Sequence, residues 1–179
     1  MKILVDTREQ NPLEFSHSII TEVRMVKLNV GDYGVMFEDG HTPSVFFERK
    51  SLPDLFGTMG KGYVRFKREI IRVQETKSTL IIIIEGSLTK VLKGVSYSRM
   101  EGISIVRKLF TIWIRYGIGF VCCKDRDEMS RYITEFYYSM GKEYIRRAKN
   151  EPNSNRQALN GNRIDGIHGD VQRQPGSDS

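Results

Sequence analysis

Two carboxylates that are distant in the sequence, Asp32 and Glu48, are candidates for metal-dependent chemistry. Asp32 follows Gly31 at the start of one apolar segment, and Glu48 lies near the end of the next. The dipeptide Asp39-Gly40 between these segments is a strong signal of a hairpin turn, and a hairpin brings the two outer ends together. Two carboxylate oxygens beside open coordination positions suit Mg²⁺ or Mn²⁺ rather than zinc.

Further charged side chains are expected at the same point. Lys50 lies two residues after Glu48, so strand alternation puts both on one face, where they can hold and orient an attacking water. Asp6 ends the first apolar segment and can join the cluster, with Arg8 close behind it. The alternative is that these are solvated charges at strand ends, and for Asp32 or Arg8 alone that alternative is favoured. The convergence of the whole set favours a functional site.

The spacing of apolar residues, which predicts the strands and helices that position this cluster, changes along the chain. Up to Arg49 the apolar segments are short and roughly alternating, which predicts an antiparallel meander of strands over residues 2–5, 23–30, 33–38 and 44–49. After it, apolar residues recur at helical spacing over residues 63–73. A continuous apolar run at 79–84 predicts a strand that is buried on both faces.

Polar residues mark the expected helix starts. Ser51 can cap a short helix that carries Pro53 in its first turn. Asp125 and Glu128 form a similar pair before the last helix, which runs towards Arg147.

Between these helices, Ser98 and Glu101 form a capping-box pattern, and Gly117 ends the helix that follows. Its expected apolar face includes Ile103, Val106, Phe110 and Trp113. A strand at 120–123 comes next. Strands first, and then helices alternating with strands, predict an α/β fold with a mixed central sheet, antiparallel and then parallel, flanked by helices.

The spacing of the charged residues resembles a known family pattern of Gly-Asp, a variable gap, Glu-Arg-Lys, three residues and Asp. Here the pattern stands at Gly31-Asp32, Glu48-Arg49-Lys50 and Asp54. The segments Val5-Asp6-Thr7-Arg8-Glu9, Asp54-Leu55-Phe56 and Arg65-Phe66 extend the likeness over roughly residues 3–145. The chain is thereby similar to the nuclease domain of the XPF-type structure-specific endonucleases, which have a restriction-endonuclease-like fold.

The resemblance implies a catalytic role for each matching residue. Asp32 and Glu48 would be metal ligands, with the backbone carbonyl of Arg49 completing the Mg²⁺ or Mn²⁺ site. Lys50 would position or activate the attacking water. Asp6 would lie beside the metal and is predicted as a further ligand.

Other matching residues would support this centre or contact DNA. Arg49 would organise the site or meet a phosphate, and Asp54 would hold that network, although a first-turn helix residue favoured by the helix dipole is an open alternative for Asp54. Arg8 and Arg65 would face the DNA backbone. Helix geometry is expected to place Lys61 and Arg68 in one stripe with Arg65, and a solvated surface position is the open alternative for Arg65.

Charge divides the chain into two parts. Lys and Arg number 28 against 22 Asp and Glu, for a net charge of +6. Residues 151–179 carry three basic and four acidic side chains, which leaves +7 for residues 1–150. A basic body suits a polyanion such as DNA, although solubility alone explains such a charge. We expect a nuclease domain over residues 1–150 and a disordered polar tail over 151–179.

Several protein classes are not expected. The longest apolar run, Leu80 to Ile84, is too short to span a bilayer, so no membrane association is predicted. Cys122 and Cys123 are sequence neighbours and do not suggest a secreted disulfide scaffold. The start of the chain has no signal-peptide pattern. The expected location is intracellular, in the cytoplasm of a bacterial host for a phage or bacterial protein and in the nucleus for a eukaryotic one.

The leading interpretation is a metal-dependent DNA endonuclease for branched, flapped or forked DNA in repair, recombination or replication. A catalytically weak DNA-binding or scaffolding subunit of the same fold is the alternative, and a sequence-specific restriction enzyme is a third. DNA is the expected partner, and a homodimer or a protein partner is left open. The apolar stripe of the last helix favours core packing over a dimer interface; it comprises Tyr132, Ile133, Phe136, Tyr137, Met140 and Tyr144.

Overall fold

The computed structural model describes residues 1–150, and the predicted disordered tail, residues 151–179, lies outside the described residues. The chain divides into two units, Met1–Gly141 and Lys142 onwards. The sheet and the charged cluster predicted from the sequence both belong to the first unit. Within residues 1–150, no helix combines the length and the apolar composition that crossing a bilayer requires.

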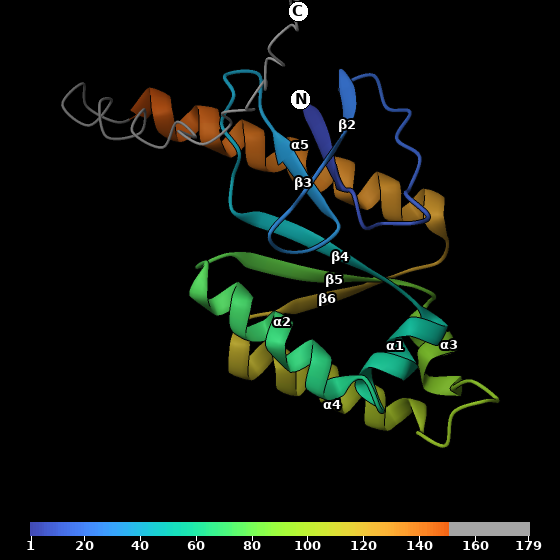
Figure 1. The fold of residues 1–179 in the computed structure, drawn as a ribbon. Coiled ribbons are helices and arrows are strands. Elements are labelled where there is room, and N and C mark those ends of the chain that lie inside the picture. The colour runs from blue at the N-terminus through green and yellow to red at the C-terminus, as the bar shows by residue number, and fades with distance from the viewer. Residues whose placement is uncertain (151–179) are drawn as a thin grey trace, which may run out of the picture. The chain divides into compact units, whose positions relative to one another are not determined.

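A mixed six-stranded sheet forms the centre of the first unit, with strand order β2-β1-β3-β4-β5-β6 (Figure 1). Strand β3 pairs antiparallel with both β1 and β4, whereas β4, β5 and β6 are parallel. This arrangement confirms the predicted fold class. The strands are β1 (Lys2–Asp6), β2 (Glu22–Val26), β3 (Tyr33–Met36), β4 (Val45–Ser51), β5 (Thr79–Glu85) and β6 (Gly119–Cys123).

The first two strands differ from the predicted meander. β2 pairs parallel with β1, in the register Lys2↔Glu22 to Asp6↔Val26, and lies at the outer edge of the sheet. Parallel neighbours need a long crossover connection, which residues 7–21 supply without regular structure. β3 therefore pairs with β1 rather than with the strand that precedes it in the sequence.

Five helices accompany the sheet in the described residues. Two of the three predicted caps are present, because the Ser51 hydroxyl accepts a hydrogen bond from the Asp54 N–H at 3.2 Å and Asp125 accepts one from the Glu128 N–H at 2.9 Å. Gly117 ends α4 in the left-handed conformation, as predicted. The helices are α1 (Leu52–Met59), α2 (Tyr63–Glu75), α3 (Leu88–Lys93), α4 (Gly102–Tyr116) and α5 (Arg126–Asn150); the short α3 was not predicted.

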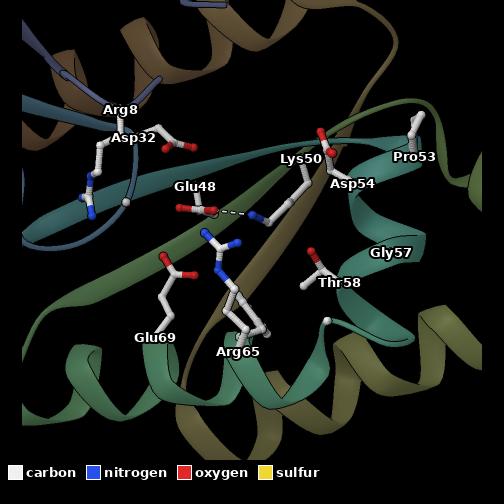
Figure 2. Close-up of a pocket in the computed structure, with 13 residues that line it drawn as sticks. Arg8, Asp32, Glu48, Lys50, Pro53, Asp54, Gly57, Thr58, Arg65 and Glu69 are labelled. Carbon is white, nitrogen blue, oxygen red and sulfur yellow. Dashed lines mark hydrogen bonds and ion pairs between the residues drawn. The ribbon is translucent and has the colours of Figure 1, made fainter. Parts of the chain in front are cut away.

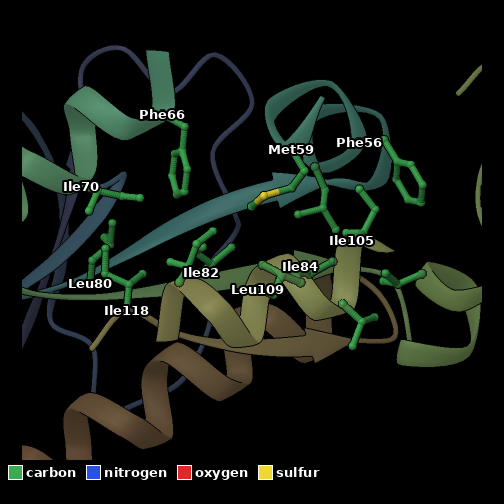
Figure 3. Close-up of a cluster of buried hydrophobic side chains, with 14 of the residues drawn as sticks. Phe56, Met59, Phe66, Ile70, Leu80, Ile82, Ile84, Ile105, Leu109 and Ile118 are labelled. Atoms are coloured by element: carbon green, nitrogen blue, oxygen red, sulfur yellow. The ribbon is translucent and has the colours of Figure 1, made fainter. Parts of the chain in front are cut away.

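The core lies on both faces of the sheet. On one face, β5 contributes Leu80, Ile82 and Ile84 to a cluster with side chains of α1, α2 and α4 (Figure 3). On the other, the Phe47 ring meets the rings of Tyr132, Phe136 and Tyr137 edge-on, with centroids 5.2 to 6.1 Å apart. The prediction that the apolar stripe of the last helix packs into the core is confirmed for Ile133 and Tyr137, which are buried, and Phe136 is half-buried, whereas Tyr132 is 39% exposed.

The start and the buried face of α4 differ from the prediction. The helix begins at Gly102, with Glu101 as N-cap but without a side-chain capping bond in the described part of the chain. Its buried side chains are Ile105, Val106, Leu109 and Ile112, whereas Ile103, Phe110 and Trp113 are exposed. The helix is apolar on two sides, and the side with these four buried residues joins the core cluster that covers β5. The start of the helix lies against α3, since a Cβ at Gly102 would lie 2.1 Å from the Val91 carbonyl oxygen.

Candidate active site

The main chain of β4 holds Asp32 in place. The Asp32 N–H donates to the Phe47 carbonyl at 2.7 Å, and the Arg49 N–H donates to Oδ2 of Asp32 at 2.8 Å. Gly31 makes this approach possible, because its φ is +67° and a Cβ there would lie 2.8 Å from the Phe47 carbonyl oxygen. The Gly-Asp pair is therefore a docking turn that places the carboxylate beside β4.

Glu48 and Lys50 share the face of β4 that Asp32 approaches, as strand alternation predicts. The Lys50 ammonium forms an ion pair with Oε1 of Glu48, and both side chains are largely buried. These residues line one pocket of about 500 Å³. Figure 2 shows it between β4 and the helices α1 and α2. The remaining charged side chains of the pocket are Arg8, Asp54, Arg65 and Glu69.

Arg49 points to the opposite face of the sheet and does not line the pocket. Its guanidinium donates to Glu9 at 3.2 Å and to Glu85 at 3.0 Å, and the side chain is only 12% exposed. The side chain is thus held away from a position where it would meet a phosphate. Arg49 organises the site through its backbone N–H, which binds Asp32.

Asp6 differs from the predicted metal ligand. Its Oδ1 accepts hydrogen bonds from the N–H and Nε of Arg8, and its Oδ2 accepts from Nη2 of Arg8 and from the Leu28 N–H, at 2.6 to 3.1 Å. The side chain is fully buried and is not part of the pocket lining. Four bonds use the accepting capacity of a carboxylate, so Asp6 supports the loop and orients Arg8 instead of offering oxygen to a cation.

Asp54 lines the pocket from the first turn of α1, which is the position that the helix interpretation predicts. The Arg49 side chain, whose network Asp54 was predicted to hold, points to the opposite face of the sheet and bonds Glu9 and Glu85. Its Oδ2 accepts a hydrogen bond from the Ser51 hydroxyl at 2.6 Å, while its own N–H donates to the same hydroxyl. This reciprocal pair fixes the carboxylate at the start of the helix.

The predicted DNA-contacting cations do not form one stripe. Arg8, whose side chain is 58% exposed, and Arg65 both line the pocket. Lys61 precedes α2 and borders a neighbouring cavity. Arg68 is exposed and lines neither of these two cavities. Only two of the four cations therefore face the carboxylates.

Glu69 is a pocket residue that sequence reasoning missed. It lies one helical turn after Arg65 on α2, and both side chains reach towards Glu48 in Figure 2. Burial, and then the negative charge of Glu48, raise the pKa of Glu69 to about 7. The available signal was its spacing of four from Arg65, beside the buried stripe of Phe66 and Ile70.

The electrostatics of the pocket suit a cation. Burial, and next the charge of Glu48, raise the pKa of Asp32 to about 8. Burial opposes the charge of Lys50, yet the adjacent carboxylate of Glu48 outweighs it and raises the pKa of Lys50 above its ordinary value. A site in which carboxylates repel one another gains from a bound positive charge.

The donor set suits a hard ion with few protein ligands. Within residues 1–150, no group of three or more His, Cys, Asp or Glu side chains is arranged to hold a metal. Mg²⁺ usually keeps several waters and binds through one or two carboxylates, and Asp32 and Glu48 are such a pair.

Comparisons with known proteins agree with this fold. The family model described as ERCC4 domain matches residues 5–136, which include every residue of the pocket. Two solved structures of XPF from Aeropyrum pernix are each 23% identical to this chain. The first has a TM-score of 0.57 and aligns over 75% of this chain and 64% of its own length. The second, a complex with DNA, has a TM-score of 0.60 and aligns over 79% of this chain and 66% of its own length. The chain thus spans less than two thirds of their length. No curated protein sequence matches it.

Proposed function

This chain belongs to the ERCC4 domain family, and from that premise we propose that it is a DNA endonuclease that hydrolyses phosphodiester bonds with the aid of Mg²⁺ or Mn²⁺. We propose branched, flapped or forked DNA as its substrate, in repair, recombination or replication. The observation that carries the proposal is the presence of Asp32, Glu48 and Lys50 in one pocket.

Each pocket residue has a part in this reaction. Asp32 and Glu48 would hold the ion, which when bound polarises the scissile phosphate and makes water more acidic. Lys50 donates hydrogen bonds to the attacking water and to the charge that develops on the phosphate. Arg8 and Arg65 line the same pocket and would bind the phosphate that is cut or its neighbours.

The alternative of a catalytically weak subunit receives less support. A subunit that only binds DNA has no need for a buried carboxylate pair, since such a pair repels phosphates and its burial is costly. Asp32 and Glu48 are nevertheless held in place, Asp32 by main-chain hydrogen bonds and Glu48 by the ion pair with Lys50. The retained pair therefore favours an enzyme.

One paired assay separates the interpretations. A flap, a fork and a plain duplex of the same sequence are incubated with the protein in Mg²⁺, in Mn²⁺ and in EDTA, with Asp32→Asn as the inactive control. Metal-dependent cleavage of the branched substrates alone supports the proposal. Cleavage of the duplex at a fixed sequence would indicate a restriction enzyme, and binding without cleavage in any condition would indicate the scaffolding subunit.

A homodimer or a protein partner is also part of the proposal. Support comes from α4, where Phe110, Trp113 and Ile114 are exposed next to the edge strand β6, and exposed apolar groups of this kind often mark contacts between proteins. The mass in solution, compared between the parent and Ile114→Glu, tests this proposal. If the parent is a monomer at micromolar concentration, the homodimer proposal is disproved.

A further inference from the structure

A second cavity, of about 700 Å³, lies beside the candidate active site. Helix α1 separates the two, because Pro53 and Gly57 line both. The rest of its wall comes from the turn between α1 and α2 and from the loop between α3 and α4. A Cβ added at Gly57 would meet no atom of the described chain within 4 Å, so this part of the shared wall is open.

The chemistry of this cavity differs from that of the active site. Its apolar surface comes from Phe56, Met100 and Tyr97, and Tyr97 is 64% exposed. Lys61 and Arg99 supply two positive charges, while no Asp or Glu of the described residues lines it. Exposed aromatic rings flanked by cations bind single-stranded nucleic acid, because bases stack on the ring and phosphates contact the cations.

The position of the cavity decides which part of a nucleic acid it would receive. In a duplex both faces of each base are stacked on neighbouring pairs, so a duplex base cannot cover the Tyr97 ring. A nucleotide that is unpaired next to a branch point has a free face. Because Gly57 lines both cavities, a strand whose scissile phosphate lies at Asp32 and Glu48 would enter this second cavity by crossing Gly57.

We propose that this cavity binds an unpaired nucleotide of the strand that is cut, with its base stacked on Tyr97 and its phosphate contacted by Lys61 and Arg99. This inference rests on the proposed function and names the feature by which a branched substrate differs from a plain duplex. It assigns Lys61 to single-stranded rather than duplex DNA.

The test uses the full chain without metal and a single-stranded oligothymidylate that contains one 2-aminopurine. Tyr97→Ala should weaken binding about tenfold or more and abolish the quenching of 2-aminopurine fluorescence, because stacking is lost. Tyr97→Phe keeps the ring and should bind within about twofold of the parent. Tyr138→Ala, on α5, is the matched control and should bind as the parent does. Affinity for a plain duplex should be the same in all four proteins.

Three further variants examine the two phosphate contacts and the passage across Gly57. Lys61→Ala and Arg99→Ala should each make the salt dependence of single-strand binding shallower by about 0.7 in log–log slope. Gly57→Leu should leave the melting temperature nearly unchanged and slow cleavage of a flap, since its side chain stands in the open wall.

Parent-like binding and quenching by Tyr97→Ala would overturn the inference, and so would an equal loss of duplex affinity. A Tyr97-dependent dimer without oligothymidylate binding would also overturn it, in favour of a second copy of the chain. Binding needs no cleavage, so the two proposals can fail separately. If the base stacks on Tyr97 but the protein cuts no DNA, only the proposed nuclease activity is disproved. If the protein cuts DNA but Tyr97→Ala binds oligothymidylate as the parent does, only the proposed nucleotide site is disproved.

Discussion

The backbone N–H of Arg49 binds Oδ2 of Asp32 at 2.8 Å, so a main-chain atom of β4 sets the position of the first of the two proposed metal-binding carboxylates. The second carboxylate, Glu48, is the preceding residue of the same strand. The two groups therefore share the main chain of β4 as their support. Rigid placement of this kind is what a metal site requires.

Glu48→Gln should abolish cleavage and leave DNA binding largely intact. The substitution removes one proposed metal ligand, and loss of metal assistance costs several kcal/mol in the transition state, or about a thousandfold in rate. Single-turnover cleavage of a flap and binding in EDTA give the two measurements. Glu135→Gln, an exposed change on α5, is the matched control and should be unaffected. Near-parental cleavage by Glu48→Gln would disprove the assignment of the site.

Gly31→Ala should lower both stability and activity although it changes no charge. A left-handed φ costs a residue with a Cβ about 1–2 kcal/mol, and the contact with the Phe47 carbonyl adds to that cost and displaces Asp32. Gly40→Ala isolates the first effect, because Gly40 has a φ of +85° and open space around its Cβ position in the described chain. Thermal melting and cleavage are compared; equal losses for the two variants would show that the close contact is unimportant.

Glu69→Gln should raise the Mg²⁺ concentration needed for half-maximal cleavage by about five- to tenfold. Above pH 7, where a Glu69 carboxyl with a pKa of about 7 is mostly ionised, the side chain adds negative charge beside Glu48, and its removal weakens the attraction for a cation. The rate is measured as a function of Mg²⁺, with Glu75→Gln at the exposed end of α2 as the control. An unchanged midpoint would mean that Glu69 has no influence on the metal, and a loss of cleavage at saturating Mg²⁺ would place it in the reaction itself.

Asp6→Asn should destabilise the fold without changing the Mg²⁺ midpoint. Burial alone would raise the pKa of Asp6, but the hydrogen bonds from Arg8 and from the backbone lower it below its ordinary value of 3.8. A lowered pKa stabilises the fold above pH 3.8, and that contribution is lost as the pH falls through the folded-state pKa.

The asparagine variant should therefore melt about 5 °C lower at pH 7, for a loss of about 2 kcal/mol. The difference in melting temperature between this variant and the parent should become smaller as the pH falls below 3.8. A shifted Mg²⁺ midpoint at parental stability would restore Asp6 as a metal ligand.

Arg65→Ala should make the salt dependence of duplex binding shallower by about one unit of log–log slope, since it removes one phosphate contact. Arg72→Ala provides the comparison, because Arg72 lies on the same helix and does not line the pocket. The measurement is the dissociation constant in EDTA over a range of salt. Equal slopes for both variants would place Arg65 among the solvated surface residues.

Local rules account for the part of the site that the sequence predicts. Glu48 and Lys50 share a face because strand alternation has no exception over this short distance. Asp32 joins them because the hairpin around Asp39-Gly40 returns the chain to the same place, although its turn is longer than two residues. Ser51 begins α1 because a hydroxyl there satisfies a helix N–H.

The other features depend on contacts between distant segments. Arg49 faces Glu9 and Glu85, and neither partner can be recognised before the sheet is assembled. Glu69 becomes a pocket residue only because α2 packs with that side towards β4. The parallel pairing of β2 with β1 follows an irregular connection that has no periodic pattern. The prediction of the buried face of α4 was wrong because the helix has apolar residues on two sides, and the sequence does not show which side is buried.

The glycine at position 31 has a consequence for the evolution of such chains. A descendant that replaced Gly31 would lose the close approach that positions Asp32 beside β4, although its sequence would keep every acidic and basic residue. Such a lineage could lose the proposed cleavage activity and keep DNA binding, and a comparison of charged positions alone would not detect the change. Judging from sequence whether a relative cuts DNA therefore requires inspection of the residue before the aspartate as well as the aspartate itself.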